Sequence, residues 1–139
     1  MKTYYLESSA VIKLFIQEPE TKALIEWLKT FRAESKFGFV TSELTRLEVI
    51  GKLAQLGLNL APANQFFASV TMLPIKRNIL ELAIGSRANG LKTLDAIHHA
   101  TIQWLATDLA GAVCYDKQLS RAVGNSGVSV YSPGATSTS

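Results

Sequence analysis

The sequence predicts a single α/β domain in which helices surround a mainly parallel sheet. Short apolar runs of strand type alternate with longer segments whose apolar residues recur every three or four positions, which is typical of parallel strands joined by helices. The 139 residues suffice for one domain with a substantial core, and 47% of them are hydrophobic while 18% are charged. We expect this domain to span residues 1–133, with a disordered polar tail at 134–139.

Strands are predicted where short β-type runs are bounded by polar or turn residues. In chain order they lie at residues 2–6, 36–41, 110–115 and 128–131. The run at 71–76 is ambiguous because Pro74 lacks the N–H that a central strand needs. This run is therefore expected to be an edge strand or an extended connection.

Helices are predicted from apolar periodicity and from capping and breaking residues. In chain order they lie at residues 8–16, 20–31, 42–56, 61–70, 77–89, 93–105 and 117–123. Hydroxyl groups that accept hydrogen bonds from free N–H groups are expected to cap the helices at Ser8, Ser9, Ser42 and Thr93. The apolar face of the third helix is expected to contain Leu44, Leu47, Ile50 and Leu53.

Composition and charge exclude several classes of protein. The longest apolar runs fall far short of the roughly 20 residues that cross a bilayer, and the N-terminus lacks the apolar segment of an export signal. Cys114 is the single cysteine, so it forms no internal disulfide and is expected to be a small buried strand residue. We therefore expect a cytoplasmic protein without a membrane partner. The net charge of +3 permits nucleic-acid binding but does not indicate it.

All three aspartates of the chain lie between Thr93 and Asp116. Asp95 falls in the first turn of a predicted helix, where the helix dipole favours an anion. Asp116 follows a predicted buried strand, at the edge where open α/β sheets keep their ligands, and Glu7 follows the first strand in the same way. The third aspartate, Asp108, is expected in a solvated turn or cap.

The predicted helix at 42–56 carries two further candidates, Glu43 and Glu48. They lie five residues apart, about 140° around the helix axis, so at most one faces a given pocket. Converging carboxylates repel each other unless a cation compensates, and Mg²⁺ or Mn²⁺ accepts such oxygen ligands. An acidic pocket of this kind predicts phosphodiester hydrolysis by a metal-activated water.

Four segments of the chain carry a resemblance to a known family. They are Y-L-E-S-S-A-V-I-K-L-F-I-Q-E-P-E, S-E-L-T-R-L-E-V, T-L-D-A-I-H-H-A-T and V-C-Y-D-K-Q-L. In this order they closely resemble PIN-domain ribonucleases of the VapC type, which are toxins of bacterial toxin–antitoxin pairs. The resemblance runs from about Lys2 to Pro133. It implies a three-layer α/β/α sandwich, Mg²⁺-dependent cleavage of RNA, a homodimer, and an antitoxin that occludes the groove.

The resemblance also implies roles for individual residues. The acids that match the catalytic and metal-binding positions are Glu7, Glu48, Asp95 and Asp116. Glu48 matches better than Glu43, because the small hydroxyl residues that precede the helix glutamate in the family correspond to Ser42 and Thr45. Ser9 matches a polar residue that supports the site.

One departure from the family pattern concerns Glu7. The first motif of the family usually begins with aspartate, and glutamate is one methylene longer, whereas Mg²⁺ requires near-ideal octahedral geometry. An alternative is therefore an attenuated PIN module that binds RNA or an antitoxin with little cleavage. A second alternative is a metal phosphohydrolase that acts on DNA or on a small phosphate ester.

The remaining chemistry-bearing residues have simpler interpretations. His98 and His99 point in different directions because they are adjacent, and His98 is expected to be packed or hydrogen-bonded. Trp27 and Trp104 lie on apolar stripes, which favours packing in the core or a dimer interface. Each cation near the acids is individually expected to be a solvated surface charge, including Lys13. As a set they are candidates for contacts with backbone phosphates, in particular Arg46, Lys92, Lys117 and Arg121.

Overall fold

Five parallel strands form one sheet in the order β3-β2-β1-β4-β5, which confirms the predicted fold class. The computed structural model describes residues 2–32 and 37–136, so the predicted strand residue Lys36 and the tail residues 137–139 lie outside the described part. The strands are β1 (Lys2–Leu6), β2 (Phe37–Ser42), β3 (Thr71–Leu73), β4 (Leu109–Val113) and β5 (Val130–Tyr131). Of the two alternatives for residues 71–76, the structure shows the edge strand, because β3 lies at the edge of the sheet and ends just before Pro74.

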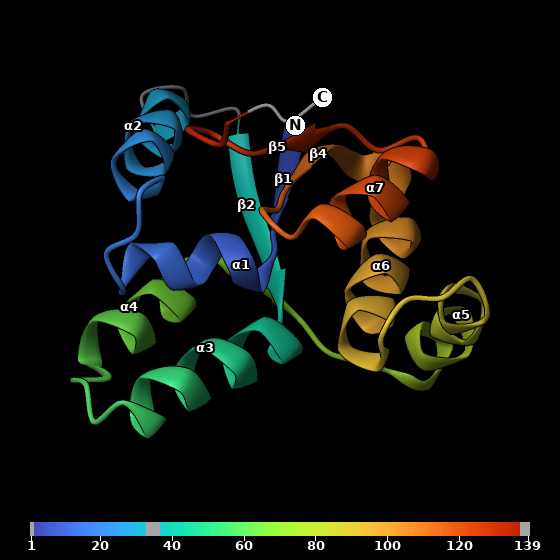
Figure 1. Ribbon diagram of the computed structural model, residues 1–139, viewed down its shortest axis with the longest axis horizontal. Helices are drawn as coiled ribbons and strands as arrows, with labels where there is room; N and C mark the ends of the chain where they lie inside the picture. The colour runs from blue at the N-terminus through green and yellow to red at the C-terminus, as the bar shows by residue number, and fades with distance from the viewer. Residues whose placement is uncertain (1, 33–36, 137–139) are drawn as a thin grey trace.

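Helices cover both faces of this sheet (Figure 1). On one face lie α1 (Ser8–Val11) with the short 3-10 helix η1 (Ile12–Leu14), α2 (Thr21–Arg32), α3 (Glu43–Gln55) and α4 (Ala61–Ser69). On the other face lie α5 (Arg77–Ala88), α6 (Thr93–Leu105) and α7 (Lys117–Asn125). A second 3-10 helix, η2 (Ala106–Asp108), connects α6 to β4. Within the described residues, no helix combines the length and the apolar character required to cross a bilayer.

The alternation of side chains along the strands divides the core in two. Tyr5 of β1 and Ala112 of β4 point toward α5, α6 and α7, whereas their neighbours Leu6 and Val113 point toward α1, α2, α3 and α4. These four residues are at most 2% exposed. The central strands are therefore apolar on both faces, as parallel sheets require.

Close packing between β4 and β5 depends on Gly111. A Cβ atom at this position would lie 2.8 Å from Cδ2 of Tyr131 and 2.9 Å from the carbonyl oxygen of Ser129. Both distances are too short for a carbon contact. The absence of a side chain at Gly111 thus allows the ring of Tyr131 to lie against the sheet.

One prediction about an apolar face is wrong. Leu47 is 68% exposed, because the buried side of α3 is formed by Thr45, Val49 and Leu53, and Leu47 lies about 200° around the axis from Val49. Trp104 is 57% exposed and so does not pack in the core of this chain, which leaves the dimer interface as the alternative for this residue. By contrast, Trp27 packs edge-on against the buried ring of Tyr4, with 5.2 Å between the ring centroids.

The helix caps differ in part from those predicted. Ser42 caps α3 as expected, because its Oγ accepts a hydrogen bond from the backbone N–H of Thr45 at 3.3 Å. Helix α6 begins at Thr93 itself and has Lys92 as its N-cap, so Thr93 is not the cap. The serine hydroxyls do not cap α1 either, since the side chain of Glu7 accepts from the N–H of Ser9. A glutamate at this strand exit thereby serves the backbone as well as the site.

Candidate active site

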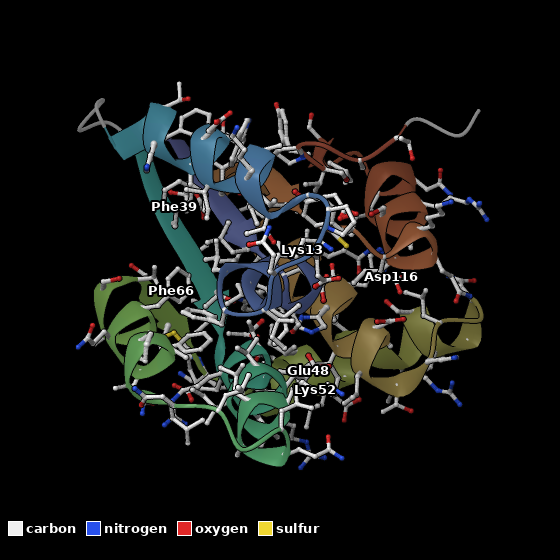
Figure 2. All side chains as sticks on the ribbon, turned by 60° about the vertical axis from the view of Figure 1, so that its left-hand side comes forward. Lys13, Phe39, Glu48, Lys52, Phe66 and Asp116 are labelled. Carbon is white, nitrogen blue, oxygen red and sulfur yellow. The ribbon has the colours of Figure 1, made fainter. Side chains whose placement is uncertain are left out.

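The candidate site lies where the central strands end. Strand β1 is flanked by β2 and β4, and the chain passes to opposite sides of β1 to build these neighbours, which creates a switch point at their carboxyl ends. Glu7 directly follows β1. Asp116 follows β4 after two intervening residues, because the strand ends at Val113 and not at Tyr115 as predicted. Figure 2 shows Glu48 on α3 and Asp116 at the start of α7, and both helices contact α6.

Glu7 is buried, with 4% of its surface exposed, and its two oxygens have different surroundings. Oε1 accepts hydrogen bonds from the backbone N–H and the hydroxyl of Ser9, and from the thiol of Cys114 at 3.2 Å. Oε2 lies 3.6 Å from Nε2 of His98. One carboxylate oxygen is thus held by the fold, and the other faces the neighbouring charges of the site.

Ser9 joins the exits of the two central strands. Its hydroxyl donates to Glu7 after β1 and accepts from the backbone N–H of Tyr115 after β4 at 2.8 Å. This contact fixes Glu7 relative to the segment that leads to Asp116. The structure thus places Ser9 beside the first acid, in a position suited to the supporting role that the resemblance implies.

His98 contacts Glu48 directly. Its Nε2 lies 2.6 Å from Oε1 of Glu48, which also accepts a hydrogen bond of 2.6 Å from the hydroxyl of Ser8. On the other side of the ring, Nδ1 lies 3.1 Å from the hydroxyl oxygen of Tyr5, and that hydroxyl donates to Ser42 at 2.9 Å. Both ring nitrogens of His98 therefore face hydrogen-bond acceptors, an arrangement that suits the doubly protonated, positively charged ring.

The pKa shifts of this pair reflect the same contacts. Burial disfavours the charged form of His98, but the hydrogen bond to Glu48 and the charges of Glu7, Glu48 and Asp95 outweigh burial and raise the pKa of His98. Burial would likewise raise the pKa of Glu48, yet the hydrogen bonds from His98 and Ser8 prevail and lower it. The pair is thus stabilised in its ionised form.

Asp95 and Asp116 enter the site from the starts of two helices. Asp95 lies in the first turn of α6 and is partly buried, whereas Asp116 is exposed and caps α7 by accepting the N–H of Leu119 at 2.8 Å. The pKa of Asp95 is raised by burial first, and then by the negative charges of Asp116 and Glu7. The site acids are therefore close enough to repel each other.

The site acids have the right kind of ligand atom for a divalent metal ion, but their side chains are not arranged as a metal site. Carboxylate oxygens are ligands that Mg²⁺ and Mn²⁺ prefer. The pKa of Asp95 is raised first by burial and then by the charges of Asp116 and Glu7, and a divalent cation would offset this second contribution. Among the described residues, however, no group of three or more histidine, cysteine, aspartate or glutamate side chains is arranged to hold a metal ion. The positive charge nearest to Glu7 and Glu48 is instead that of His98.

The residues outside the site mostly follow their simpler interpretations. Glu43 is an exposed acid in the first turn of α3, and Asp108 is exposed in η2. Cys114 is buried as expected, although it follows β4 and contacts Glu7, a partner that its sequence position did not indicate. Exposed positions are also occupied by the candidate phosphate contacts Arg46, Lys92, Lys117 and Arg121.

The prediction for Lys13 is wrong, because this residue is buried and is not a solvated surface charge. The residue is 6% exposed, and its Nζ lies 3.3 Å from Glu18 and 3.4 Å from Glu20. The same nitrogen lies 4.6 Å from the ring centroid of Tyr115. Lys13 therefore links η1 to the turn before α2. Glu18 and Glu20 flank Pro19 in this turn. Their spacing from Lys13 is not that of an ion pair along one helix, so the sequence did not indicate this pairing.

A parallel α/β sheet with carboxylates at the ends of its central strands is typical of an α/β enzyme domain with its site at that edge of the sheet. The similarity of the chain to known proteins identifies the family. The family model described as PIN domain matches residues 4–125. The chain belongs to the PIN-domain family and is a homologue of the VapC ribonucleases. It is 37% identical over 134 residues to Ribonuclease VapC46 of Mycobacterium tuberculosis (strain ATCC 25618 / H37Rv), an alignment that covers 96% of this chain and 99% of that protein.

Two solved structures share the fold at low sequence identity. The toxin-antitoxin complex from Klebsiella pneumoniae has a TM-score of 0.69 at 19% identity, covering 94% of this chain and 97% of the other. Mycobacterium tuberculosis VapC20, described as a Sarcin-Ricin loop cleaving toxin, has a TM-score of 0.66 at 16% identity, covering 86% and 94%. Both support the assignment of the fold.

Proposed function

We propose that this protein is a toxin-type endoribonuclease that hydrolyses RNA phosphodiester bonds with Mg²⁺, or Mn²⁺, held by its acidic site. The metal ligands in this proposal are Glu7, Glu48, Asp95 and Asp116. The observation that carries the proposal is that acids distant along the chain meet in one place: Glu7 and Glu48 lie 3.6 Å and 2.6 Å from the same nitrogen of His98. Burial, followed by the charges of Asp116 and Glu7, raises the pKa of Asp95, in agreement with this arrangement. The homology to VapC46, a ribonuclease by name, supports the same activity.

Each acid contributes differently in this proposal. The lowered pKa of Glu48 keeps its carboxylate ionised near neutral pH, and His98 and Ser8 hold its Oε1 in place. Asp116 is oriented because its Oδ1 accepts the N–H of Leu119. A bound divalent ion supplies charge neutralisation at the phosphate and lowers the pKa of the attacking water. The exposed cations at the site margin bind the flanking phosphates.

Exposed apolar side chains and the similarity to toxin-antitoxin proteins suggest two protein partners. Leu47 and Leu94 are 68% and 48% exposed, and they are chain neighbours of Glu48 and Asp95. Such groups next to the acids suit a protein partner that covers the groove. We propose an antitoxin in this position, in line with the structural likeness to a toxin-antitoxin complex. We also propose a homodimer, with the exposed Trp104 in its interface, and light scattering of the purified chain tests it.

One observation favours the attenuated alternative, in which the domain binds RNA or an antitoxin but cleaves poorly. Oε1 of Glu7 is already committed to Ser9 and Cys114, which leaves one oxygen for a cation. Cleavage of single-stranded RNA in the presence of Mg²⁺ or Mn²⁺ distinguishes the two proposals. Metal-dependent cleavage that is lost in Asp95→Asn supports the ribonuclease, and RNA binding without cleavage supports the attenuated module.

The assay includes substrates and controls that define the reaction class. Single-stranded DNA and a nitrophenyl phosphate ester are offered beside RNA, and preference for either would favour a different phosphohydrolase. EDTA provides the metal-free reference. The matched control is Asp108→Asn, which removes an exposed aspartate outside the site and is expected to leave RNA cleavage unchanged.

A further inference from the structure

A cavity lies between α5, α6 and α7, away from the acids, and its volume is about 460 Å³. Its lining is rich in side-chain carboxamides and includes one guanidinium group and one histidine. These groups belong to Asn89, Gln103, Gln118, Asn125, Arg121 and His99. No carboxylate side chain lines this cavity in the part of the chain that the structure describes, in contrast to the acidic site.

His99 forms a fixed polar wall of the cavity. The hydroxyl of Ser126 donates to the carbonyl of Ala122 at 3.0 Å, so the oxygen of Ser126 accepts from Nε2–H of His99 at 2.7 Å. Nδ1 then accepts the hydroxyl proton of Ser86 at 2.6 Å. Burial lowers the pKa of His99, in agreement with a neutral ring. Both ring nitrogens are satisfied within the protein. Gln103 also donates from its Nε2 to the hydroxyl oxygen of Ser126 at 3.4 Å, so it contacts a ligand through its remaining polar atoms.

The cavity shares one face of α6 with the site acid Asp95. Asp95, His99 and Gln103 follow each other at intervals of four residues and therefore share one face of α6. The rise from Asp95 to His99 is about 6 Å, which is one turn of helix and on the scale of one nucleotide. Arg121 and Asn125 lie on α7, five and nine residues after its N-cap Asp116, so they reach the cavity from the side of α7 that faces away from that acid. A nucleotide chain that follows the shared face of α6 from Asp95 would reach this cavity.

The lining chemistry selects a class of ligand. A carboxamide presents a donor and an acceptor side by side and pairs with the edge of a nucleobase, and single-stranded RNA exposes such edges. The guanidinium of Arg121 suits a phosphate oxygen. We propose that this cavity recognises the base of the nucleotide next to the scissile phosphate. The inference rests on the proposed ribonuclease function and deepens it. It assigns the preference for particular RNA bases to Gln103 on α6 and Asn125 on α7.

The test compares two double variants of the full chain. Gln103→Leu/Asn125→Leu removes carboxamides from the cavity, and Gln55→Leu/Asn64→Leu removes exposed carboxamides from α3 and α4 as a matched control. Binding of fluorescent A, C, G and U hexanucleotides is measured in EDTA, where cleavage is absent. We expect a base preference in wild type and control, and in the cavity variant about tenfold weaker binding of the preferred oligomer with loss of the preference.

Cleavage-site sequencing of a mixed RNA in Mg²⁺ provides the second readout. In the cavity variant, we expect the base preference beside the cut to flatten while the preference at more distant positions persists. Cleavage with an unchanged base profile in the variant overturns the inference and leaves the ribonuclease proposal standing. Absence of cleavage in wild type, together with a base preference in EDTA that the variant loses, overturns the ribonuclease proposal and supports base binding by the cavity.

Discussion

Nε2 of His98 lies 2.6 Å from Oε1 of Glu48, and this contact joins α6 to α3 across the carboxyl ends of the central strands. The ring is held from behind by Tyr5, and Tyr5 is held by Ser42. His98 also lies 3.6 Å from Glu7. The histidine therefore contacts two site acids at once, and its positive charge offsets their mutual repulsion.

The His98–Glu48 contact is expected to appear as a coupling energy. In a double-mutant cycle of His98→Gln and Glu48→Gln, the two substitutions should be non-additive by about 1 to 3 kcal/mol, because each single change leaves a partly buried polar partner unsatisfied. Urea unfolding of the metal-free protein at pH 6 measures the four stabilities. Additive effects within about 0.3 kcal/mol would show that the contact contributes little.

The same pair predicts a pH window for stability. The pKa of His98 is raised above its ordinary value of 6.5, so its contribution is complete below that pH and is lost as the pH rises through the higher folded value. The pKa of Glu48 is lowered from 4.5, so its contribution is complete above 4.5 and is lost as the pH falls through the lower folded value.

The difference in unfolding free energy between wild type and His98→Gln should therefore be largest between pH 4.5 and 6.5 and shrink on either side. Urea unfolding in EDTA across this range measures it. A difference that grows steadily above pH 8 would contradict the charged state of the ring.

Asp95→Asn is expected to separate stability from activity. The raised pKa of Asp95 means that its ionised form is unfavourable in the folded protein, so the substitution should raise metal-free stability at pH 7 by about 0.5 kcal/mol, a modest figure because the residue is partly exposed. Cleavage of RNA should be lost.

Urea unfolding with EDTA and with Mg²⁺ measures both parts of this effect, because Mg²⁺ should stabilise wild type and have little effect on the variant. Asp108→Asn serves as the exposed control. Equal stabilisation of wild type and Asp95→Asn by Mg²⁺ would argue against Asp95 as a ligand.

Glu7→Asp is expected to raise the turnover of RNA with Mg²⁺ several-fold. Aspartate is also a strong N-cap, so the start of α1 is retained, while the shorter side chain suits the compact octahedral geometry of Mg²⁺. Single-turnover cleavage rates measure the change. Glu81→Asp, which shortens an exposed glutamate on α5, is the matched control. Unchanged or lower turnover would count against the first-motif role of Glu7.

Two glycine substitutions are expected to have opposite signs. Gly111→Ala should destabilise the fold by about 1 to 3 kcal/mol, because the added methyl group meets Tyr131 and the backbone of Ser129. Gly51→Ala lies within α3, where the added methyl group meets nothing within 4 Å, and should stabilise by about 0.5 to 1 kcal/mol. Thermal unfolding of both variants measures this. A neutral Gly111→Ala would mean that Tyr131 moves freely.

Much of the architecture was predictable because it depends on local pattern. Short β-type runs indicated the strands, and the helical spacing of apolar residues indicated the helices. The placement of Glu7 after the first strand and of Asp116 after a late strand indicated one edge of a sheet. Parallel strands bring their carboxyl ends together whatever the details of packing. The acids were therefore assigned to one region before any distance was known, while their role as metal ligands stays a prediction.

The amino-acid order alone determined the fold class and the edge of the sheet at which Glu7 and Asp116 lie, since both arise from local pattern and from the rules of parallel sheets. It did not determine the end of β4, which comes two residues earlier than predicted. Only the tertiary structure decided that His98 joins Glu48, that Lys13 is buried between two glutamates, and that Leu47 faces outward. Periodicity defines which residues share a helix face, but it does not tell which neighbour covers that face. The energy of a buried charge is set by the groups within a few ångströms of it, so its partner depends on which element packs against that face.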